Sequence, residues 1–594
     1  MQESSPDPIL QPARLRWQAD GTPVACDYDD VYFSRAGALA ESAYVFLRHN
    51  GLPARFGAGD FTIVETGFGT GLNALLTAQQ WQRHGGAGTL HFISCEKHPL
   101  MLADLQRAHK CWPELAFWAE RLQRHYPALT PGWHQVALAD NVRVWLWFGD
   151  VHEGLADLDT AVDAWYLDGF APARNPQMWT EALFQRMAAL SAPGATFATF
   201  TAAGVVRRGL EKAGFAVDKV PGFGRKREML CGRWPGTGRP QKARVQTLAV
   251  VGAGLAGAQV AYHAARAGVA VTVFEAQAPA SGASGNWAGV FHPLVTADWS
   301  LRSQWYQLAL ESLSATLAPA WAAGVPGGWC ELPHFLVDQR WQMRMARFAA
   351  RGGDQAGVVA PTAPPCETAW PVWCYQQGGW VSPKAWVAWL LAHPGIELVQ
   401  VEVGQVEAHN GRWCLHGRCF DALVWATGWR PQPLPGWPTD MLRPVAGQVE
   451  RFAWADHGFK PHTPWVHGGY SVPMAEGLVV GATFVKSAAV AVSAAARTEN
   501  YQRLLQACVQ VGVAMRGESR VSVRPTTRDH MPIVGLWPEQ ASLGVSLGHG
   551  SRGILSTPLA AVWLCHDLGI QPVPQFSKLR HASRVERFFN HVKE

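Results

Sequence analysis

Residues 61–73 read FTIVETGFGTGLN, and residues 248–257 read LAVVGAGLAG. Each stretch begins as an apolar, strand-forming run and ends in a glycine-rich loop. Glycines directly after a strand allow a tight turn and let a ligand approach the backbone closely. Because the glycine spacing differs between the two loops, we predict two different nucleotide-type sites in one α/β protein.

A chain of 594 residues is too long for one hydrophobic core, and its 48% hydrophobic and 16% charged residues are typical of a globular protein. Residues 233–240, RWPGTGRP, are rich in Pro, Gly and Arg and separate two strand–helix patterns. We therefore predict a first domain at 1–235, a linker at 236–246 and a second domain at 247–594.

Membrane, disulfide and metal sites are not indicated. No apolar run approaches the roughly 18 residues of a membrane helix, and the start lacks a charged-then-apolar leader. None of the eleven cysteines forms a C-x-x-C pair, and the nearest two are Cys414 and Cys419. We predict a soluble cytoplasmic protein with reduced thiols and no metal.

The first glycine loop favours S-adenosylmethionine. It lacks the Lys-Ser/Thr of a phosphate-binding P-loop and the G-x-G-x-x-G spacing of dinucleotide folds. Acids stand where later strands end: Glu96, placed to accept from ribose hydroxyls, and Asp150, placed near an adenine. Another nucleoside remains the alternative ligand. The predicted cofactor residues are Glu65, Gly67, Gly69, Gly71, Asn73, Glu96 and Asp150.

Residues 168–179, DGFAPARNPQMW, place a carboxylate at the end of a strand and before a loop held by two prolines. Methyl transfer requires alignment of a neutral nucleophile with a sulfonium carbon. Asp168 can hold an amine and receive its proton, which makes it the predicted catalytic residue. The alternative is a carboxylate that only caps a turn.

The second loop carries the dinucleotide fingerprint: Gly252, Gly254 and Gly257 follow a strand and open a helix, and Glu275 lies 23 residues after Gly252. The fingerprint fits NAD or FAD. Three later elements favour FAD: SGASGN at 281–286, VWATG at 424–428 and GHGSRG at 548–553. From these we add the predicted cofactor residues Ser284, Gly285, Asn286, Thr427, Gly428, Gly548, Gly550 and Gly553.

Four motifs in the first half resemble one known family. DVYFS at 30–34, the loop at 65–73, the segment 168–179 and GFGRKRE at 222–228 look like the methyltransferase half of the bifunctional tRNA 5-methylaminomethyl-2-thiouridine biosynthesis (MnmC) family. Residues 41–44 read ESAY where a Glu-Thr-Arg-Tyr-like string is expected, which puts an arginine role there in doubt. The resemblance implies methylation of the amine of 5-aminomethyl-2-thiouridine at the tRNA wobble position.

The second half resembles the glycine and D-amino acid oxidase superfamily, which implies a two-part FAD-binding fold. With the first half, it implies FAD-dependent removal of the carboxymethyl group from 5-carboxymethylaminomethyl-2-thiouridine, with release of glyoxylate. A carboxylate substrate needs a cation near the flavin. The candidates are Arg524, Arg528 and Arg552, of which we select Arg528 and Arg552, whereas His292 and His549 are expected to pack or to edge the flavin.

The distribution of charge favours a tRNA partner. The segment between Val205 and Val245 contains eleven Lys or Arg and three Asp or Glu, which gives it a local charge of +8 in a chain of net charge +5. Further basic residues are Arg340, Arg344, Arg347 and Arg351, at helical spacing, and Lys578, Arg580, Arg584, Arg587 and Lys593 near the end. The rival hypothesis is a fused small-molecule amino acid oxidase and amine N-methyltransferase. We also predict a monomer.

Overall fold

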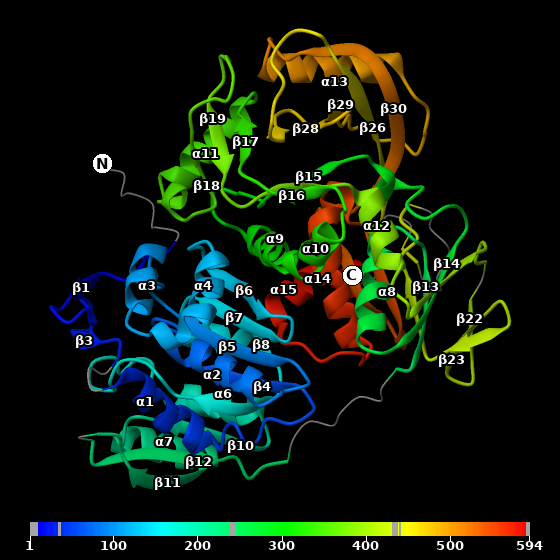
Figure 1. Cartoon of the computed structure of the whole chain (residues 1–594). Helices are drawn as coiled ribbons and strands as arrows, with labels where there is room; N and C mark the ends of the chain where they lie inside the picture. The colour runs from blue at the N-terminus through cyan, green and yellow to red at the C-terminus, as the bar shows by residue number, and fades with distance from the viewer. Residues whose placement is uncertain are drawn as a thin grey trace. The chain divides into compact units, whose positions relative to one another are not determined.

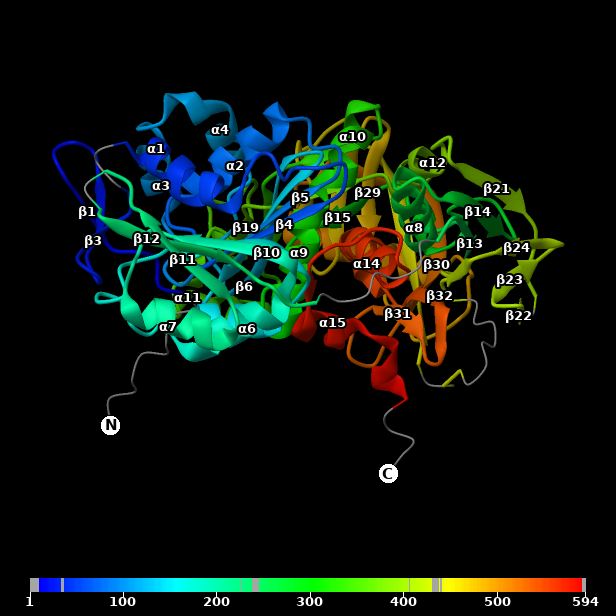
Figure 2. The same cartoon turned by 90° about the horizontal axis from the view of Figure 1, so that it is seen from below.

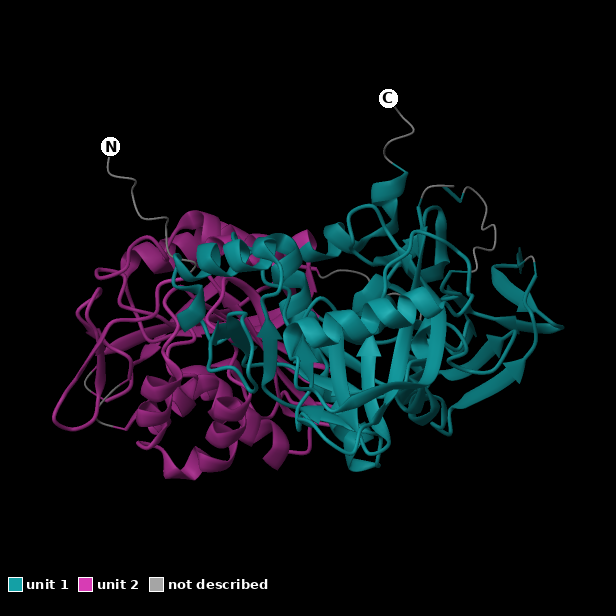
Figure 3. Ribbon diagram, turned by 90° about the horizontal axis from the view of Figure 1, so that it is seen from above, with its two compact units in different colours: residues 1–7, 242–573, 579–594 teal, residues 8–241, 574–578 magenta. Residues whose placement is uncertain are grey.

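The computed structural model describes residues 10–33, 37–224, 226–237, 245–404, 406–429, 437–438 and 441–589 (Figure 1). The chain divides into two compact units (Figure 3). The N-terminal unit comprises 8–241 and 574–578, and the C-terminal unit includes 242–573 and 579–594. Several residues of the sequence analysis lie outside the described ranges: Ser34, Arg225, Arg239, Lys242, Arg244, Lys593 and most of the predicted linker.

The N-terminal unit is built on an eight-stranded sheet with the order β11-β12-β10-β9-β4-β5-β7-β6. The central pairs are parallel, and β6, β11 and β12 pair antiparallel at the edges. Their bounds are β4 Phe61–Glu65, β5 Leu90–Glu96, β6 Gly132–Ala139, β7 Val142–Phe148, β9 Val162–Tyr166, β10 Ser191–Thr199, β11 Ala216–Pro221 and β12 Glu228–Arg233.

Helices cover both faces of this sheet (Figure 2). One face carries α1 Ala38–Ser42, α2 Leu72–Arg83, α3 Leu102–His109 and α4 Ala116–Arg124, and the other carries α6 Glu181–Leu190 and α7 Gly204–Ala213. A strand covered on both faces is buried along its whole length, and all five residues of β4 are buried, the polar Thr62 and Glu65 included. The strands predicted before Gly67, Glu96, Asp150 and Asp168 are therefore confirmed as β4, β5, β7 and β9.

A short C-terminal segment completes the N-terminal unit. Strand β33, Gln575–Phe576, pairs antiparallel with β8, Leu158–Asp159. The Phe576 ring stacks on Trp133 with 4.2 Å between centroids, and it lies 5.5 Å from the Trp145 ring. All three side chains are buried, so this unit draws part of its core from residues far along the chain.

The C-terminal unit has a first sheet of six strands in the order β21-β14-β13-β25-β32-β31. All its pairs are parallel except β31 with β32. The bounds are β13 Thr247–Val251, β14 Ala270–Glu275, β21 Ile396–Gln400, β25 Ala422–Trp425, β31 Ile533–Trp537 and β32 Gln540–Leu547. Helices α8 Leu255–Arg266 and α14 Gly553–Asp567 pack against each other beside this sheet, and α12 Pro383–Leu391 packs on α8.

A second, largely antiparallel sheet has the order β18-β19-β17-β27-β28-β29-β26-β30 and packs against α13, Ala494–Ala507 (Figure 1). Its bounds are β17 Leu332–Phe335, β18 Val359–Pro361, β19 Val372–Tyr375, β26 Arg443–Trp454, β27 Trp465–Val466, β28 Tyr470–Met474, β29 Gly477–Gly481 and β30 Val513–Thr526. This arrangement, one mainly parallel sheet and one antiparallel sheet, is the two-part architecture that the sequence predicts.

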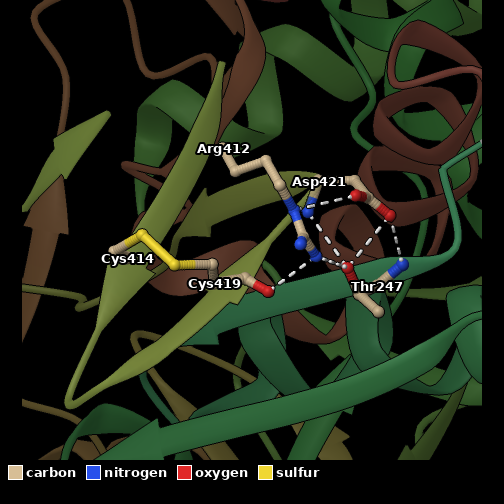
Figure 4. The surroundings of a disulfide bond; sticks show 5 residues. All are labelled: Thr247, Arg412, Cys414, Cys419 and Asp421. Atoms are coloured by element: carbon tan, nitrogen blue, oxygen red, sulfur yellow. Dashed lines mark hydrogen bonds and ion pairs between the residues drawn. A yellow bond between two sulfur atoms is a disulfide. The ribbon is translucent and has the colours of Figure 1, made fainter. Parts of the chain in front are cut away.

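A disulfide joins Cys414 and Cys419, so the prediction of reduced thiols is wrong for this pair (Figure 4). The two residues are direct cross-strand partners in the hairpin of β23, Arg412–Leu415, and β24, Arg418–Phe420, with their Cα atoms 4.2 Å apart. A five-residue separation brings two cysteines together only when a tight turn lies between them. The remaining cysteines of the described chain are free thiols.

We expect Phe576→Ala to lower the free energy of unfolding of the N-terminal unit by about 3 to 5 kcal/mol, because it leaves a cavity between two buried tryptophans. Urea unfolding followed by tryptophan fluorescence measures this change. Phe117→Ala is the matched control, since the Phe117 side chain is 57% exposed. If Phe576→Ala lowered the free energy of unfolding no more than Phe117→Ala does, β33 would contribute nothing to this core.

Candidate active sites

The N-terminal unit contains a cavity of about 550 Å³ at the carboxyl ends of β4, β5, β7 and β9. The structure brings most of the predicted residues to its wall: Gly67, Gly69, Asn73, Glu96, Asp150 and Asp168. Glu65 and Gly71 are not part of the wall. Gly71, at φ 76°, instead supplies the left-handed turn before α2, which most other residues would strain to adopt.

Glu96 shapes the glycine loop from the end of β5. Its Oε2 accepts a hydrogen bond from the Gly69 N–H at 2.8 Å, and its Oε1 accepts one from the His98 N–H at 2.9 Å. Each oxygen keeps a lone pair for a ligand hydroxyl. Asp150 lines the same cavity and caps α5, Val151–Asp157, by accepting from the His152 N–H at 3.0 Å.

Asn73 links two buried carboxyl groups. Its Nδ2 donates to Glu65 Oε1 at 2.8 Å and to Asp168 Oδ2 at 2.7 Å. Glu65 is 1% exposed, and its Oε2 accepts from Ser94 Oγ at 2.7 Å. Glu65 therefore lies behind the cavity and holds Asn73, which in turn orients the carboxyl of Asp168.

Burial controls the protonation of this pair. Burial raises the pKa of Asp168 to about 6, although the Gly169 N–H and Asn73 donate hydrogen bonds to its carboxylate. Burial, followed by the nearby Asp168 charge, raises the pKa of Glu65 well above its ordinary value. Burial therefore raises the pKa of both carboxyl groups, and of the two only Asp168 lines the cavity.

Aromatic side chains that the sequence analysis did not select surround Asp168. Tyr28 stacks on Phe170 with centroids 4.5 Å apart, and Tyr32 meets Phe170 edge-on at 5.4 Å. The Lys226 ammonium lies 4.6 Å from the Phe200 ring centroid and pairs with Glu41 at 2.9 Å. Described residues of the motifs at 30–34, 168–179 and 222–228 therefore line one cavity. In the sequence, only their shared resemblance to one family connects these motifs.

The C-terminal unit contains a second cavity, of about 780 Å³, at the carboxyl ends of β13, β14, β25 and β32. It collects the predicted residues Gly252, Gly254, Glu275, Ser284, Asn286, Thr427, Gly428, Gly548, Gly550, Arg552 and Gly553. Three predicted residues do not line it: Gly257, Gly285 and Arg528.

In the second glycine loop, as in the first, a strand-end carboxylate accepts a backbone N–H of the loop. Glu275 Oε2 accepts from the Ala253 N–H at 2.8 Å, and Ser284 Oγ accepts from the Leu255 N–H at 2.9 Å. A Cβ on Gly257 would lie 1.9 Å from the Gly252 carbonyl oxygen, so this glycine is required for the packing of α8 rather than for ligand contact. The N-terminus of α8 faces the cavity, where a helix start attracts phosphate.

Two arginines from different elements line this cavity. Arg552 precedes α14; its Nη1 donates to the His292 carbonyl at 3.3 Å, and burial lowers the pKa of its guanidinium. Arg524 comes from β30 and donates to the Thr483 carbonyl at 2.7 Å. The structure does not bring Arg528 to the cavity. Its guanidinium lies 5.5 Å from the Phe588 ring centroid.

Three histidines line this cavity: His292, His467 and His549. Burial lowers the pKa of His467 to about 3. Burial lowers the pKa of His549 to about 3, and its two ring nitrogens are hydrogen-bonded to Ser546 and Ser556. Burial, with Arg552 nearby, lowers the pKa of His292 well below its ordinary value, and its ring stacks on Tyr375 at 4.2 Å. The rings of His292 and His549 thus both make contacts within the protein.

Comparison with known proteins assigns a family to each half of the chain. A family profile described as S-adenosyl-L-methionine-dependent methyltransferase matches residues 113–235, and one described as FAD dependent oxidoreductase matches residues 247–566. The chain is 38% identical to the tRNA 5-methylaminomethyl-2-thiouridine biosynthesis bifunctional protein MnmC of Hydrogenovibrio crunogenus, over 98% of this chain and 97% of the relative. The chain belongs to the MnmC family. The proteins of the same name from Marinobacter nauticus and Thiobacillus denitrificans are each 36% identical over 98% of this chain, and cover 97% and 99% of their own lengths.

The protein is therefore an enzyme with two cofactors, which confirms the predicted family, fold class and chemistry. We call the N-terminal unit the methyltransferase unit and the C-terminal unit the oxidoreductase unit. The residues present fit the cofactors: each cavity is lined by a glycine-rich loop and by a strand-end carboxylate that can accept from ligand hydroxyls, Glu96 in the first and Glu275 in the second.

Two further features of the described residues bear on the predicted partners. No helix there is long and apolar enough to cross a membrane. Within the same ranges, no three His, Cys, Asp or Glu side chains gather as they would around a metal ion.

We expect Gly254→Asp to abolish FAD binding while leaving S-adenosylmethionine binding intact. The new carboxylate would stand at the N-terminus of α8, where it repels a diphosphate. Visible flavin absorbance of the purified protein measures the loss. Gly282→Ala is the matched control, because Gly282 lines the same cavity and has no atom within 4 Å of an added Cβ. Full flavin content in Gly254→Asp would show that the FAD diphosphate does not bind at the N-terminus of α8.

Proposed function

We propose that this enzyme completes the modification of a tRNA wobble uridine in two steps. FAD-dependent oxidation removes the carboxymethyl group of 5-carboxymethylaminomethyl-2-thiouridine and gives 5-aminomethyl-2-thiouridine. S-adenosylmethionine-dependent N-methylation then gives 5-methylaminomethyl-2-thiouridine. The observation that carries this proposal is that both cavities keep their loops and strand-end acids in a chain similar to MnmC proteins along almost its whole length.

In the oxidoreductase unit, FAD held in the second cavity would supply the two-electron oxidation of the substrate carbon–nitrogen bond, and hydrolysis of the oxidised bond would release glyoxylate and the free amine. The substrate carboxylate needs a cation in a buried cavity. We assign this role to Arg552, with Arg524 as the second cation, because both guanidiniums line the cavity. Arg528, selected from the sequence, lies beside Phe588 instead.

In the methyltransferase unit, we propose that Asp168 orients the substrate amine and receives its proton as the methyl group is transferred from S-adenosylmethionine. The amine must be neutral to attack, and a carboxylate within reach removes the proton that the new bond leaves on nitrogen. Asn73 fixes the Asp168 carboxyl through the 2.7 Å hydrogen bond. The rings of Tyr28, Tyr32 and Phe170 then form an apolar wall that can hold a flat base.

The structure sharpens the charge argument for tRNA. Four described cations of the cluster between Val205 and Val245 pair with acids: Arg207, Lys212, Lys219 and Lys226. Near the end of the chain, Arg580 is 2% exposed and pairs with Asp567, so it is structural. Of the four arginines predicted at helical spacing, Arg340, Arg344 and Arg347 lie on α11, Gln339–Ala349, where Arg340 and Arg347 are exposed. Arg351 lies beyond the end of this helix. We propose α11 as the surface that meets the tRNA backbone.

The two activities divide along the chain. Every residue lining the first cavity lies between Tyr28 and Lys226, and every residue lining the second lies between Val251 and Thr557. This supports a boundary between the activities within residues 236–246. We propose that one chain suffices for both reactions, as a monomer in the cytoplasm.

Mass spectrometry of nucleosides from tRNA carrying 5-carboxymethylaminomethyl-2-thiouridine tests the function. Without S-adenosylmethionine the aminomethyl form should accumulate, and with it the methylaminomethyl form should replace it. Asp168→Asn should stop at the aminomethyl form, whereas Gly254→Asp should methylate only supplied aminomethyl tRNA. If no wobble uridine changes while free amino acids are oxidised and methylated, the rival small-molecule function holds.

The pH dependence of methylation should report Asp168. Because the pKa of Asp168 is raised to about 6, its carboxylate is ionised above that pH and protonated below it. Below about pH 6, we expect the slope of log kcat/KM for methylation against pH to increase by one unit. In Asp168→Asn, this inflection should disappear and the methylation rate should fall at least about 100-fold. Oxidation by the same protein is the internal control. An inflection that persists in Asp168→Asn would assign it to another group.

A further inference from the structure

The segment that follows β29 places an aromatic ring at the opening of the oxidoreductase cavity. Phe484 lines that cavity, yet its side chain is 56% exposed. Ala488 and Val490 of the same segment also line the cavity, and Val490 is 65% exposed. An isolated exposed apolar side chain needs no explanation, but an apolar rim around a ligand cavity marks a binding surface.

The backbone fixes the position of Phe484. Its neighbour Val485 exchanges two hydrogen bonds with Ala446 of β26, with N···O distances of 2.8 and 2.9 Å. On the other side, the Thr483 N–H donates to the Gln448 carbonyl at 3.2 Å. The ring is therefore presented from an extension of the second sheet rather than from a free loop.

A cation supports the ring. The Arg524 guanidinium lies 4.4 Å from the Phe484 centroid, and its Nη2 donates to the Thr483 carbonyl at 2.7 Å. Burial lowers the pKa of Arg524, so this guanidinium sits in a low-dielectric environment where a cation–π contact is strong. Phe484 thus contacts the Arg524 guanidinium, while more than half of its surface stays exposed to solvent.

A flat, uncharged aromatic group is the chemistry that fits this surface. Single-stranded and extruded bases are bound by stacking on aromatic side chains, which is how proteins hold a nucleotide of an anticodon loop. We propose that Phe484 is the stacking platform for the pyrimidine ring of the wobble nucleotide during oxidation, and that it acts as a positioning residue. This rests on the proposed function, because a free amino acid would offer no base to stack.

Three variants test the platform. Phe484→Leu keeps an apolar side chain but removes the ring, and Phe484→Tyr keeps the ring. Val485→Ala is the matched control, since Val485 is 53% exposed on the next residue but does not line the cavity. The measurement is kcat and KM for conversion of the carboxymethyl form in tRNA to the aminomethyl form, with flavin content and methylation of aminomethyl tRNA recorded for each protein.

We expect Phe484→Leu to lower kcat/KM about tenfold, mainly through KM, which is within the range measured for loss of one base–aromatic stack. Phe484→Tyr and Val485→Ala should stay within about twofold of the parent, and flavin content and methylation should not change in any variant. Wild-type activity of Phe484→Leu, an equal loss in Phe484→Tyr, or an equal loss in Val485→Ala would each overturn the proposal. If the parent enzyme itself fails to oxidise tRNA, the proposed function fails instead.

Discussion

Both active sites depend on one contact: a carboxylate at the end of one strand accepts a backbone N–H from the glycine loop of the neighbouring strand. Glu96 holds Gly69 in this way, and Glu275 holds Ala253, each with a 2.8 Å hydrogen bond. The contact needs parallel neighbouring strands, because only then do a loop and an acid meet at the same edge of a sheet. The rest of each cofactor cradle is arranged around this pairing.

The same scaffold serves different chemistry because different side chains reach each cavity. In the methyltransferase unit, two buried carboxyl groups share Asn73, and desolvation raises the pKa of Asp168 to about 6. In the oxidoreductase unit, Arg524 and Arg552 bring positive charge beside neutral histidines. In the proposed function, both steps act on the same nitrogen: oxidation removes its carboxymethyl group, and methylation then adds a methyl group to it.

Some residues could be placed only after folding. Arg524 and Arg528 are four residues apart, and nothing in the sequence says which faces the cavity; β30 includes Arg524 but ends at Thr526, so the chain has turned away by Arg528. Glu65 stands at the end of β4, where a ligand contact is expected, but Asn73 covers it. Cys414 and Cys419 pair only because a hairpin lies between them.

The amino-acid sequence by itself determined the two α/β folds, both cofactor classes and most of the loop residues, because glycine spacing and strand-end acids are local features of a parallel sheet. Tertiary structure alone decided which arginines line the second cavity and which of Glu65 and Asp168 lines the first. It also decided that Phe576 completes the core of a unit whose main segment ends near residue 241. It also placed Phe484 at the opening of the cavity. These outcomes follow from burial and long-range packing, which no local pattern records.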